Sequence, residues 1–174
     1  MAKLRKMLGS ADAPGVVALM RQMETQSRET LARWSAGYAR ESLLPICLAA
    51  HPQDTLPARL LALAVDWAEG RCDGKTVRPL LAALRDAARQ ETAPAVQAAL
   101  RAIGTAAAVM QTPTNALGMT FYAAAALAYH TLGEGADAAA YDACAEELFA
   151  GMLASLQSVS VPEEEHPARL DWHC

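Results

Sequence analysis

The sequence predicts an all-α protein. We expect one domain, residues 1–174, in which about seven helices pack around a central helical hairpin without charges. The first reason is a run of 32 residues between Arg101 and Glu134 that lacks Asp, Glu, Lys and Arg. The second is a composition that is 53% hydrophobic but only 5% aromatic, with much of the apolar share supplied by Ala, the strongest helix former. The third is the absence of β-branched runs with the period-two alternation that marks strands.

The first helical pattern follows Asp12-Ala13-Pro14, where Asp12 is expected to cap the helix and Pro14 to lie in its first turn. Apolar residues then recur at helical spacing along one stripe: Val16, Met20, Met23, Leu31, Trp34, Tyr38 and Pro45. The phase is unbroken through Ser27, so residues 14–45 fit either one long helix or two helices that meet at Thr25-Gln26-Ser27. We favour two helices in contact.

Turn signals divide the middle of the chain. His51-Pro52-Gln53-Asp54 is expected to form a loop, after which Pro57 opens a short helix that Gly70 closes. Thr76 is expected to cap the next helix, and Thr92 to start another. The apolar stripes of these two helices are Val77, Leu80, Leu81, Leu84 and Ala88, and then Val96, Leu100, Ile103, Ala107 and Met110.

The uncharged run is expected to fold as a hairpin, because the polar corner Gln111-Thr112-Pro113-Thr114-Asn115 interrupts it and caps a second, central helix. That helix is apolar all round, which is typical of a helix enclosed by neighbours, and Ala123 to Ala126 would let those neighbours approach closely. Asp137 is expected to cap the last helix and Pro162 to end it, with a polar tail from about residue 162. The expected buried stripe of the last helix is Tyr141, Cys144, Leu148, Met152, Leu156 and Val159.

Charge and hydropathy bear on partners and compartment. Fifteen basic residues against 19 acidic ones give a net charge of −4, and most of the basic residues are arginines spaced singly along helices, with one short cluster at Lys3, Arg5 and Lys6, so nucleic-acid binding is not expected. Residues 117–132 fall short of the roughly 18–20 apolar residues that a membrane span needs, so no membrane insertion is expected. No apolar segment follows Lys3, Arg5 and Lys6, which argues against a signal peptide. Four widely spaced cysteines are then expected to be reduced, in the cytoplasm.

No motif for catalysis, a cofactor or a metal stands out, and we expect none of the three. Glu163-x-x-His166 has the spacing of a di-iron helix motif without the second motif that such sites need, so a solvated acidic tail is favoured. His173-Cys174 offers two ligands where zinc requires four, so a C-terminus docked by Trp172 is favoured. His130 could be a buried general base, but no nucleophile can be placed beside it, and a hydrogen-bonded core histidine is favoured.

The corner Gln111–Asn115 is the most distinctive polar cluster. Its side chains lie at a helix N-terminus, where free N–H groups could hold an anion or the carboxylate of a partner. The favoured alternative is self-capping, in which Thr112 and its neighbours satisfy their own helix.

Several segments resemble the Imm-5-like immunity proteins of bacteria. They are Lys3–Ser10, Met23–Ser27 with Leu31 and Trp34, Gln111–Gly118 with Phe121-Tyr122, and Asp171–Cys174, and the resemblance extends over essentially the whole chain. Trp67-Ala-Glu-Gly70 is similar to a short W-x-x-G feature of that family, whereas Tyr141-Asp-Ala-Cys144 is one residue shorter than its Y-x-x-x-C feature. The resemblance implies an all-α cytoplasmic protein that binds and neutralises a toxin encoded with it, and it implies no catalytic residues.

Three functional hypotheses follow. The leading one is a non-enzymatic inhibitor, monomer or homodimer, that blocks a cognate toxin by surface complementarity, since an acidic face suits a basic toxin such as a nuclease. The expected contact residues are the exposed acids Glu146, Glu147, Glu163, Glu164 and Glu165.

The alternative is a small-molecule-binding helical module or regulator, with a pocket near Thr112, Asn115, Tyr122 and His130. The least favoured is a helical enzyme that uses His130, or a metal held at His166 and His173.

Overall fold

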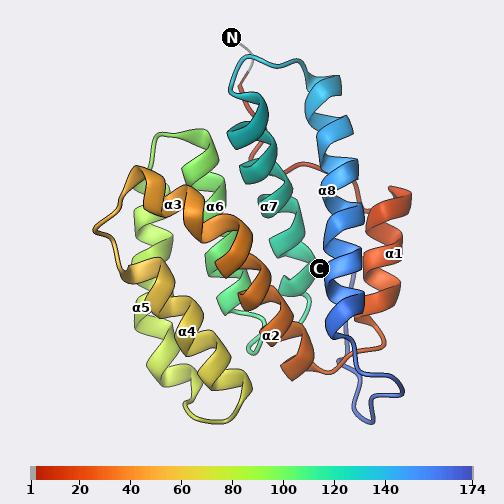
Figure 1. The fold of residues 1–174 in the computed structure, drawn as a ribbon. Helices are drawn as coiled ribbons and strands as arrows, with labels where there is room; N and C mark the ends of the chain where they lie inside the picture. Colours follow the sequence, from red (N-terminus) through yellow and green to blue (C-terminus); the bar gives the residue numbers. More distant parts are fainter. Residues whose placement is uncertain (1–2, 174) are drawn as a thin grey trace.

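The structure, a computed structural model, describes residues 3–173, and every regular element in that part of the chain is helical (Figure 1). The elements in order are α1 Pro14–Met23, α2 Arg28–Tyr38, the π-helical turn η1 Ala39–Leu43, α3 Leu44–Ala50, α4 Leu56–Ala68, α5 Gly74–Gln90, α6 Pro94–Ala107, α7 Asn115–Leu132 and α8 Ala138–Val159. The predicted all-α fold of about seven helices is confirmed.

The helices are arranged around the antiparallel pair α6 and α7, which lies in the middle of the molecule in Figure 1. α8 and α1 flank this pair on one side, and α4 and α5 lie on the other. The continuous run α2–η1–α3 crosses diagonally in front of them. The uncharged segment is therefore the hairpin that the sequence predicts, with helices packed on both of its sides.

The central helix α7 is buried because its side chains are small and apolar. Ala123, Ala124, Ala125 and Ala126 have no exposed surface at all. Phe121 is partly buried, and its ring meets the fully buried ring of Phe149 edge-on, with 6.1 Å between ring centroids and 81° between planes. None of the helices in residues 3–173 has both the length and the apolarity needed to cross a bilayer.

Residues 14–45 do not form one helix. α1 ends at Met23, and α2 starts after Ser27, whose hydroxyl oxygen accepts a hydrogen bond from the Thr30 amide at 3.1 Å. The favoured corner at Thr25-Gln26-Ser27 is thus confirmed. Beyond it the helix runs on to Ala50, with a π turn immediately before Pro45. A proline has no amide hydrogen and its ring crowds the carbonyl four residues earlier, so a locally wider turn relieves the clash.

The predicted caps of α1 and α5 are wrong. The Asp12 carboxylate accepts from the Ser10 hydroxyl, and α1 begins after Ala13 without a side-chain cap. The cap of α5 is Asp73, one turn before Thr76, and its carboxylate accepts from two backbone amides of the first turn. α6 begins at Pro94, close to the predicted start at Thr92, and it has no side-chain cap.

Two other helix ends are confirmed. Asp137 caps α8 by accepting from the Ala140 amide at 2.8 Å. Gly70, with φ +74°, ends α4, and the next amide, of Arg71, donates to the Asp66 carbonyl at 2.8 Å. Glycine suits this position because it adopts a positive φ without the steric penalty of a side chain.

The buried face of α8 differs from the predicted stripe. Tyr141, Met152 and Leu156 are buried as expected, but Val159 is 50% exposed. Cys144 and Leu148 are only partly buried. Ala145 and Phe149 are buried in their place, because the Phe149 ring packs on Phe121 of α7.

Both ends of the described chain lie on the helices. Near the N-terminus, the Tyr129 hydroxyl donates to the Arg5 carbonyl at 2.7 Å and the Leu8 amide donates to the Phe121 carbonyl at 3.2 Å. At the other end, the Ala168 amide donates to the Gln26 carbonyl at 2.8 Å. The Trp172 indole donates to Glu24 at 2.6 Å, so the predicted docking of the C-terminus by Trp172 is confirmed.

Candidate functional site

The acids predicted to contact a partner fall into two groups. Glu146 and Glu147 are exposed on the outer face of α8, and Glu163 and Glu165 are exposed in the turn after that helix. About 12 helical residues separate the groups, which is a distance of ~18 Å. This places both groups along one edge of the molecule, at α8 and at the tail that follows it (Figure 1).

Glu164 is positioned differently, because its side chain turns inward and fixes the tail to the corner between α1 and α2. One carboxylate oxygen accepts from the Ser27 amide at 2.7 Å and the other from the Thr30 hydroxyl at 3.0 Å. Burial opposes ionisation, but these hydrogen bonds and the charge of Arg33 outweigh it and hold the pKa of Glu164 below its ordinary value. Glu164 therefore has a structural role in the folded chain.

The four residues of the predicted pocket are not brought together. Asn115 and Tyr122 line one cleft of about 370 Å³ beside the central hairpin. Thr112 is exposed and lies outside the lining of that cleft. His130 is also exposed, near the opposite end of α7, so the expectation of a hydrogen-bonded core histidine is wrong. The apolar face of α7 ends before His130, where the helix leaves the enclosed part of the bundle.

The corner before α7 does not cap itself through Thr112. α7 has no side-chain cap, and the Asn115 side-chain amide donates backward to the Ala108 carbonyl at 3.3 Å. The first amides of the helix, from Asn115 to Gly118, donate to the carbonyls of Thr112, Pro113 and Thr114. Because these amides already have acceptors within the turn, the helix N-terminus offers little to an anion.

Basic side chains gather at the cleft that Asn115 and Tyr122 line. Lys6, Arg85, Arg89 and Arg101 come from the N-terminal segment, α5 and α6, and all four border this cleft. Sequence analysis missed this cluster because the four residues stand singly along the chain. The only signal was the spacing of Arg85 and Arg89, which puts them on one face of a helix.

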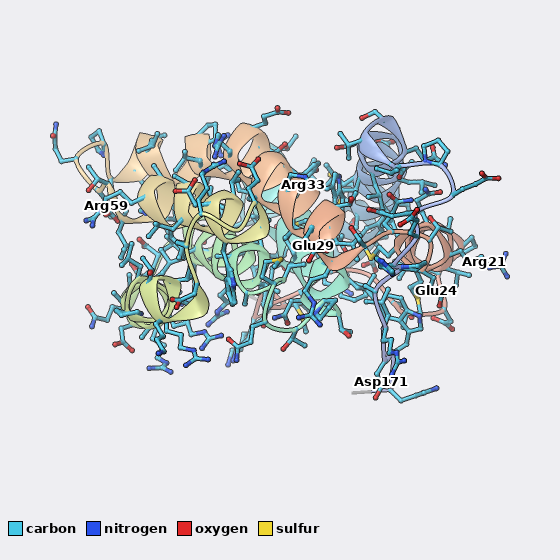
Figure 2. All side chains as sticks on the ribbon, turned by 90° about the horizontal axis from the view of Figure 1, so that it is seen from below. Arg21, Glu24, Glu29, Arg33, Arg59 and Asp171 are labelled. Carbon is cyan, nitrogen blue, oxygen red and sulfur yellow. The ribbon has the colours of Figure 1, made fainter. Side chains whose placement is uncertain are left out.

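The charges of the molecule are separated between two helices at opposite sides of the bundle. α8 carries three acidic residues and no basic one, whereas α5 carries four basic residues and one acidic one. In the view from below, many nitrogen-tipped side chains extend from the α5 side, the side away from α2 and α3 (Figure 2). The separation gives a protein of net charge −4 one acidic side and one basic side.

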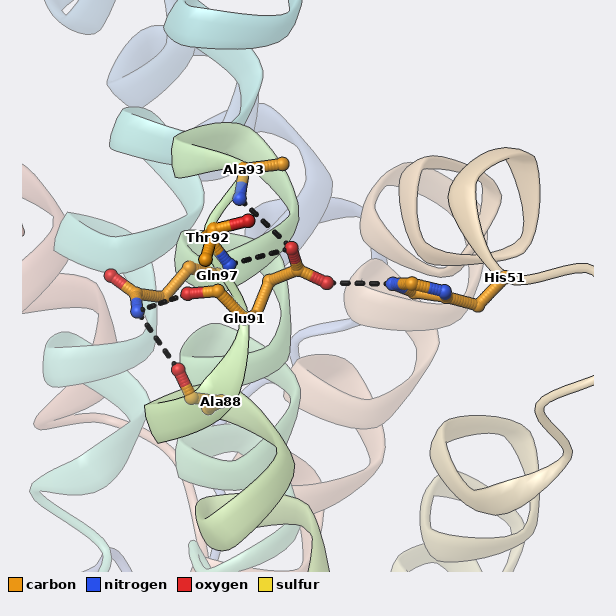
Figure 3. Close-up of polar contacts among 6 residues, drawn as sticks. All are labelled: His51, Ala88, Glu91, Thr92, Ala93 and Gln97. Carbon is orange, nitrogen blue, oxygen red and sulfur yellow. Dashed lines mark hydrogen bonds and ion pairs between the residues drawn. The ribbon is translucent and has the colours of Figure 1, made fainter.

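One further polar cluster joins α3 to the turn between α5 and α6 (Figure 3). The His51 ring nitrogen lies 2.6 Å from one Glu91 oxygen, and the other Glu91 oxygen accepts from the Thr92 and Ala93 amides, both at 2.8 Å. The backbone bond from Ala93 and the bond to His51 hold the pKa of Glu91 below its ordinary value. The Gln97 side chain ties the same turn to the Ala88 and Glu91 carbonyls.

This histidine–carboxylate pair does not have a reactive thiol beside it. Cys47 lies one helical turn before His51 but is 3% exposed, and burial raises the pKa of its thiol to about 12. A protonated, enclosed thiol is a poor nucleophile. The pair is thus best explained as a contact that fixes the end of α3 on the α5–α6 turn.

The metal motifs considered from sequence find no support in the geometry. Glu163 and His166 are both exposed in the tail. Across residues 3–173, no three His, Cys, Asp or Glu side chains are placed to share a metal ion. His173 is exposed, and Cys174 lies outside the described residues.

Comparison with known protein families identifies a family for this chain. The model of the family described as Imm-5 like putative immunity protein matches residues 21–153. No curated protein and no solved structure matches the chain. The matched range covers α2 to α7 completely, together with the end of α1 and most of α8, and it leaves out the N-terminal segment and the tail. Since the match covers well over half of its residues, the chain belongs to the Imm-5 like putative immunity protein family.

Proposed function

We propose that this protein acts in the cytoplasm as a non-catalytic immunity protein that binds a cognate toxin and neutralises it by covering its functional surface. The family membership supports a protein partner. The Cys47 thiol near the His51–Glu91 pair is buried and protonated, which favours a binding role over a catalytic one for that cluster.

The observation that carries the choice of surface is the pair of exposed acids Glu146 and Glu147 on α8, whose third acid, Asp142, is paired with Arg5. Glu146 and Glu147 form no ion pair in residues 3–173, and no basic residue stands on the same helix. Exposed charges of one sign accelerate encounter with a partner of the opposite sign. The proposed toxin surface is therefore basic, as in a nuclease.

Glu163 and Glu165 extend this acidic surface beyond the end of α8. An interface of ordinary size buries about 800 Å² on each partner, which is wide enough to include both acidic groups. Glu164 is left out of the proposed contact set, because its carboxylate is already held by Ser27 and Thr30.

Co-expression with the toxin encoded beside this protein tests the function. The wild-type protein is expected to restore growth, and growth no better than with toxin alone would refute the proposal. Charge reversal at Glu146→Lys with Glu147→Lys is expected to slow association by about tenfold or more and to weaken protection.

Glu29→Lys with Glu41→Lys is the matched control, because it makes the same charge change at two exposed acids on α2 and η1. If both double variants protect equally well while the wild type protects, the function stands and the α8 surface is the wrong one. The position of Glu29 is labelled in Figure 2.

A further inference from the structure

The cleft that contains Asn115 and Tyr122 has the form of a small-ligand site. Its lining comes from the N-terminal segment, from α5, from α6 with the following residue Ala108, and from α7. The volume of about 370 Å³ falls within the range of sites that enclose small ligands.

The charged residues that line the cleft are all basic. The four cations Lys6, Arg85, Arg89 and Arg101 border it, and no carboxylate belongs to its lining. Arg89 is paired with Asp86 at 2.6 Å, whereas Lys6, Arg85 and Arg101 form no ion pair with any of residues 3–173. Like charges that converge on one hollow repel one another, and an anion in the hollow removes that repulsion.

The chemistry of the cations indicates which class of anion the cleft would bind. Arg85 and Arg101 carry planar guanidinium groups that hold two oxygens of a phosphate at once, which a single ammonium does not. Arg101 is also half-buried, so its charge is less screened by water than that of a fully exposed arginine. Two guanidinium groups with a lysine are well suited to a dianionic phosphate.

The uncharged residues of the lining could contact a planar ring attached to the phosphate. The Tyr122 ring is partly exposed at the wall formed by α7 and offers a face for stacking. The carbonyl oxygen of the Asn115 side chain accepts no hydrogen bond from residues 3–173, because only its amide nitrogen is engaged, with Ala108. Beside the apolar side chain of Leu100, these groups would accommodate a planar ring.

We propose that this cleft binds a small phosphorylated ligand of the nucleoside phosphate class, with the phosphate held by Arg85, Arg101 and Lys6 and the planar ring beside Tyr122. This site lies on the basic side of the bundle, away from the acidic α8 surface, and does not depend on the proposed toxin contact. The basic lining is confined to one cleft, which favours a small molecule over a polymer, whose backbone needs a longer basic track.

The test is calorimetric titration and thermal shift of the full chain with ADP and with inorganic phosphate. ADP is expected to bind and to stabilise the protein, phosphate to bind more weakly, and both to weaken as salt is raised. Arg85→Gln with Arg101→Gln is expected to weaken ADP binding by about 100-fold, roughly tenfold for each lost charged contact. Arg59→Gln, an exposed arginine on α4 that does not line the cleft, is the control and is expected to bind as the wild type does.

Four outcomes would overturn the proposal. They are no binding of ADP or phosphate at millimolar concentration, binding that persists unchanged in the Arg85→Gln, Arg101→Gln variant, binding only of a single-stranded oligonucleotide, and binding only of a glutamate-rich peptide. The variant changes exposed or half-exposed groups, and circular dichroism verifies that it folds. Loss of toxin protection in the Glu146→Lys, Glu147→Lys variant has no bearing on this result.

Discussion

Substitution of Gly9 by Ala tests whether the N-terminal segment is locked onto the aromatic pair of the core. A Cβ at Gly9 would lie 2.4 Å from Cζ and 2.7 Å from Cε2 of Phe149, and 3.1 Å from Cδ1 of Phe121. Favourable carbon–carbon contacts begin near 3.5 Å, so the overlap with Phe149 is about 1 Å. The Phe149 ring is fully buried and cannot swing into solvent.

Two costs add in the Gly9→Ala variant. Overpacking of a filled core costs about 1–3 kcal/mol. The backbone at Gly9 has φ +102°, which a side chain disfavours by about 1–2 kcal/mol. The variant should therefore lose about 2–5 kcal/mol of unfolding free energy in urea denaturation. That loss corresponds to a melting temperature lower by about 6–15 °C in a domain of this size.

A double-mutant cycle with Phe149→Leu separates the two costs. Leu lacks the Phe149 ring atoms that the new methyl group meets, so in that background Gly9→Ala should cost the backbone term and only the milder contact with Phe121, and the coupling should be about 1–3 kcal/mol. Gly151→Ala on α8 is the matched control, because nothing lies within 4 Å of its Cβ position and alanine in a helix is more stable than glycine by about 1 kcal/mol. A Gly9→Ala loss below 0.5 kcal/mol, or one that is the same in both backgrounds, would refute the packing described for the N-terminal segment.

Three further predictions concern the polar contacts and the central helix. Glu164→Ala should free the tail, so that trypsin cleaves after Arg169 at least tenfold faster than in the wild type, while Glu165→Ala should leave cleavage unchanged. Glu91→Gln should cost about 1 kcal/mol at pH 7. Because the folded-state pKa of Glu91 is lowered, its stabilisation is present above the ordinary glutamate pKa near 4.3 and is lost as pH falls through the folded value, so wild type and variant should converge in acid denaturation. Ala125→Leu should lower stability by about 1–3 kcal/mol, since that position has no exposed surface, and unchanged urea unfolding would contradict its burial.

The central hairpin could be predicted from sequence because its signal is both long and simple. A run of 32 residues without charge cannot cover the outside of a small domain, and a polar corner with proline in the middle leaves a hairpin as the compact solution. The burial of Ala123 to Ala126 follows from that argument alone. Composition thus determines which segment lies inside, independently of how the helices are oriented.

The errors concern features that depend on single residues. Asp12 and Thr76 are acceptable cap residues in the wrong place, because Ser10 takes the carboxylate of the first and Asp73 lies one turn ahead of the second. Phe149 was missed because a stripe through Cys144 and Leu148 fits helical spacing equally well. The choice between the two stripes was made by the position of Phe121 on another helix, which periodicity within one helix does not contain.

The candidate sites depend on the same non-local information. Asn115 and Tyr122 could be singled out from sequence as polar groups beside an apolar helix, but Lys6, Arg85 and Arg101 join them only through the packing of α5, α6 and the N-terminal segment. Glu164 illustrates the reverse case, since three consecutive glutamates look equivalent in a sequence. The docked tail turns the middle one toward Ser27 and leaves its neighbours in solvent.

The uncharged interior has a consequence for both proposed surfaces. Glu146, Glu147 and Arg85 are exposed and form no ion pair within residues 3–173, so their charges are not needed to hold the hairpin together. Substitutions at Glu146, Glu147 or Arg85 should therefore change stability by no more than about 0.5 kcal/mol, as is usual for exposed residues. Loss of toxin protection or of ADP binding in these variants would then report on the surfaces themselves, since the population of folded protein stays the same. If these variants lost stability together with binding, the charges on α5 and α8 would support the fold, contrary to the exposure of these side chains.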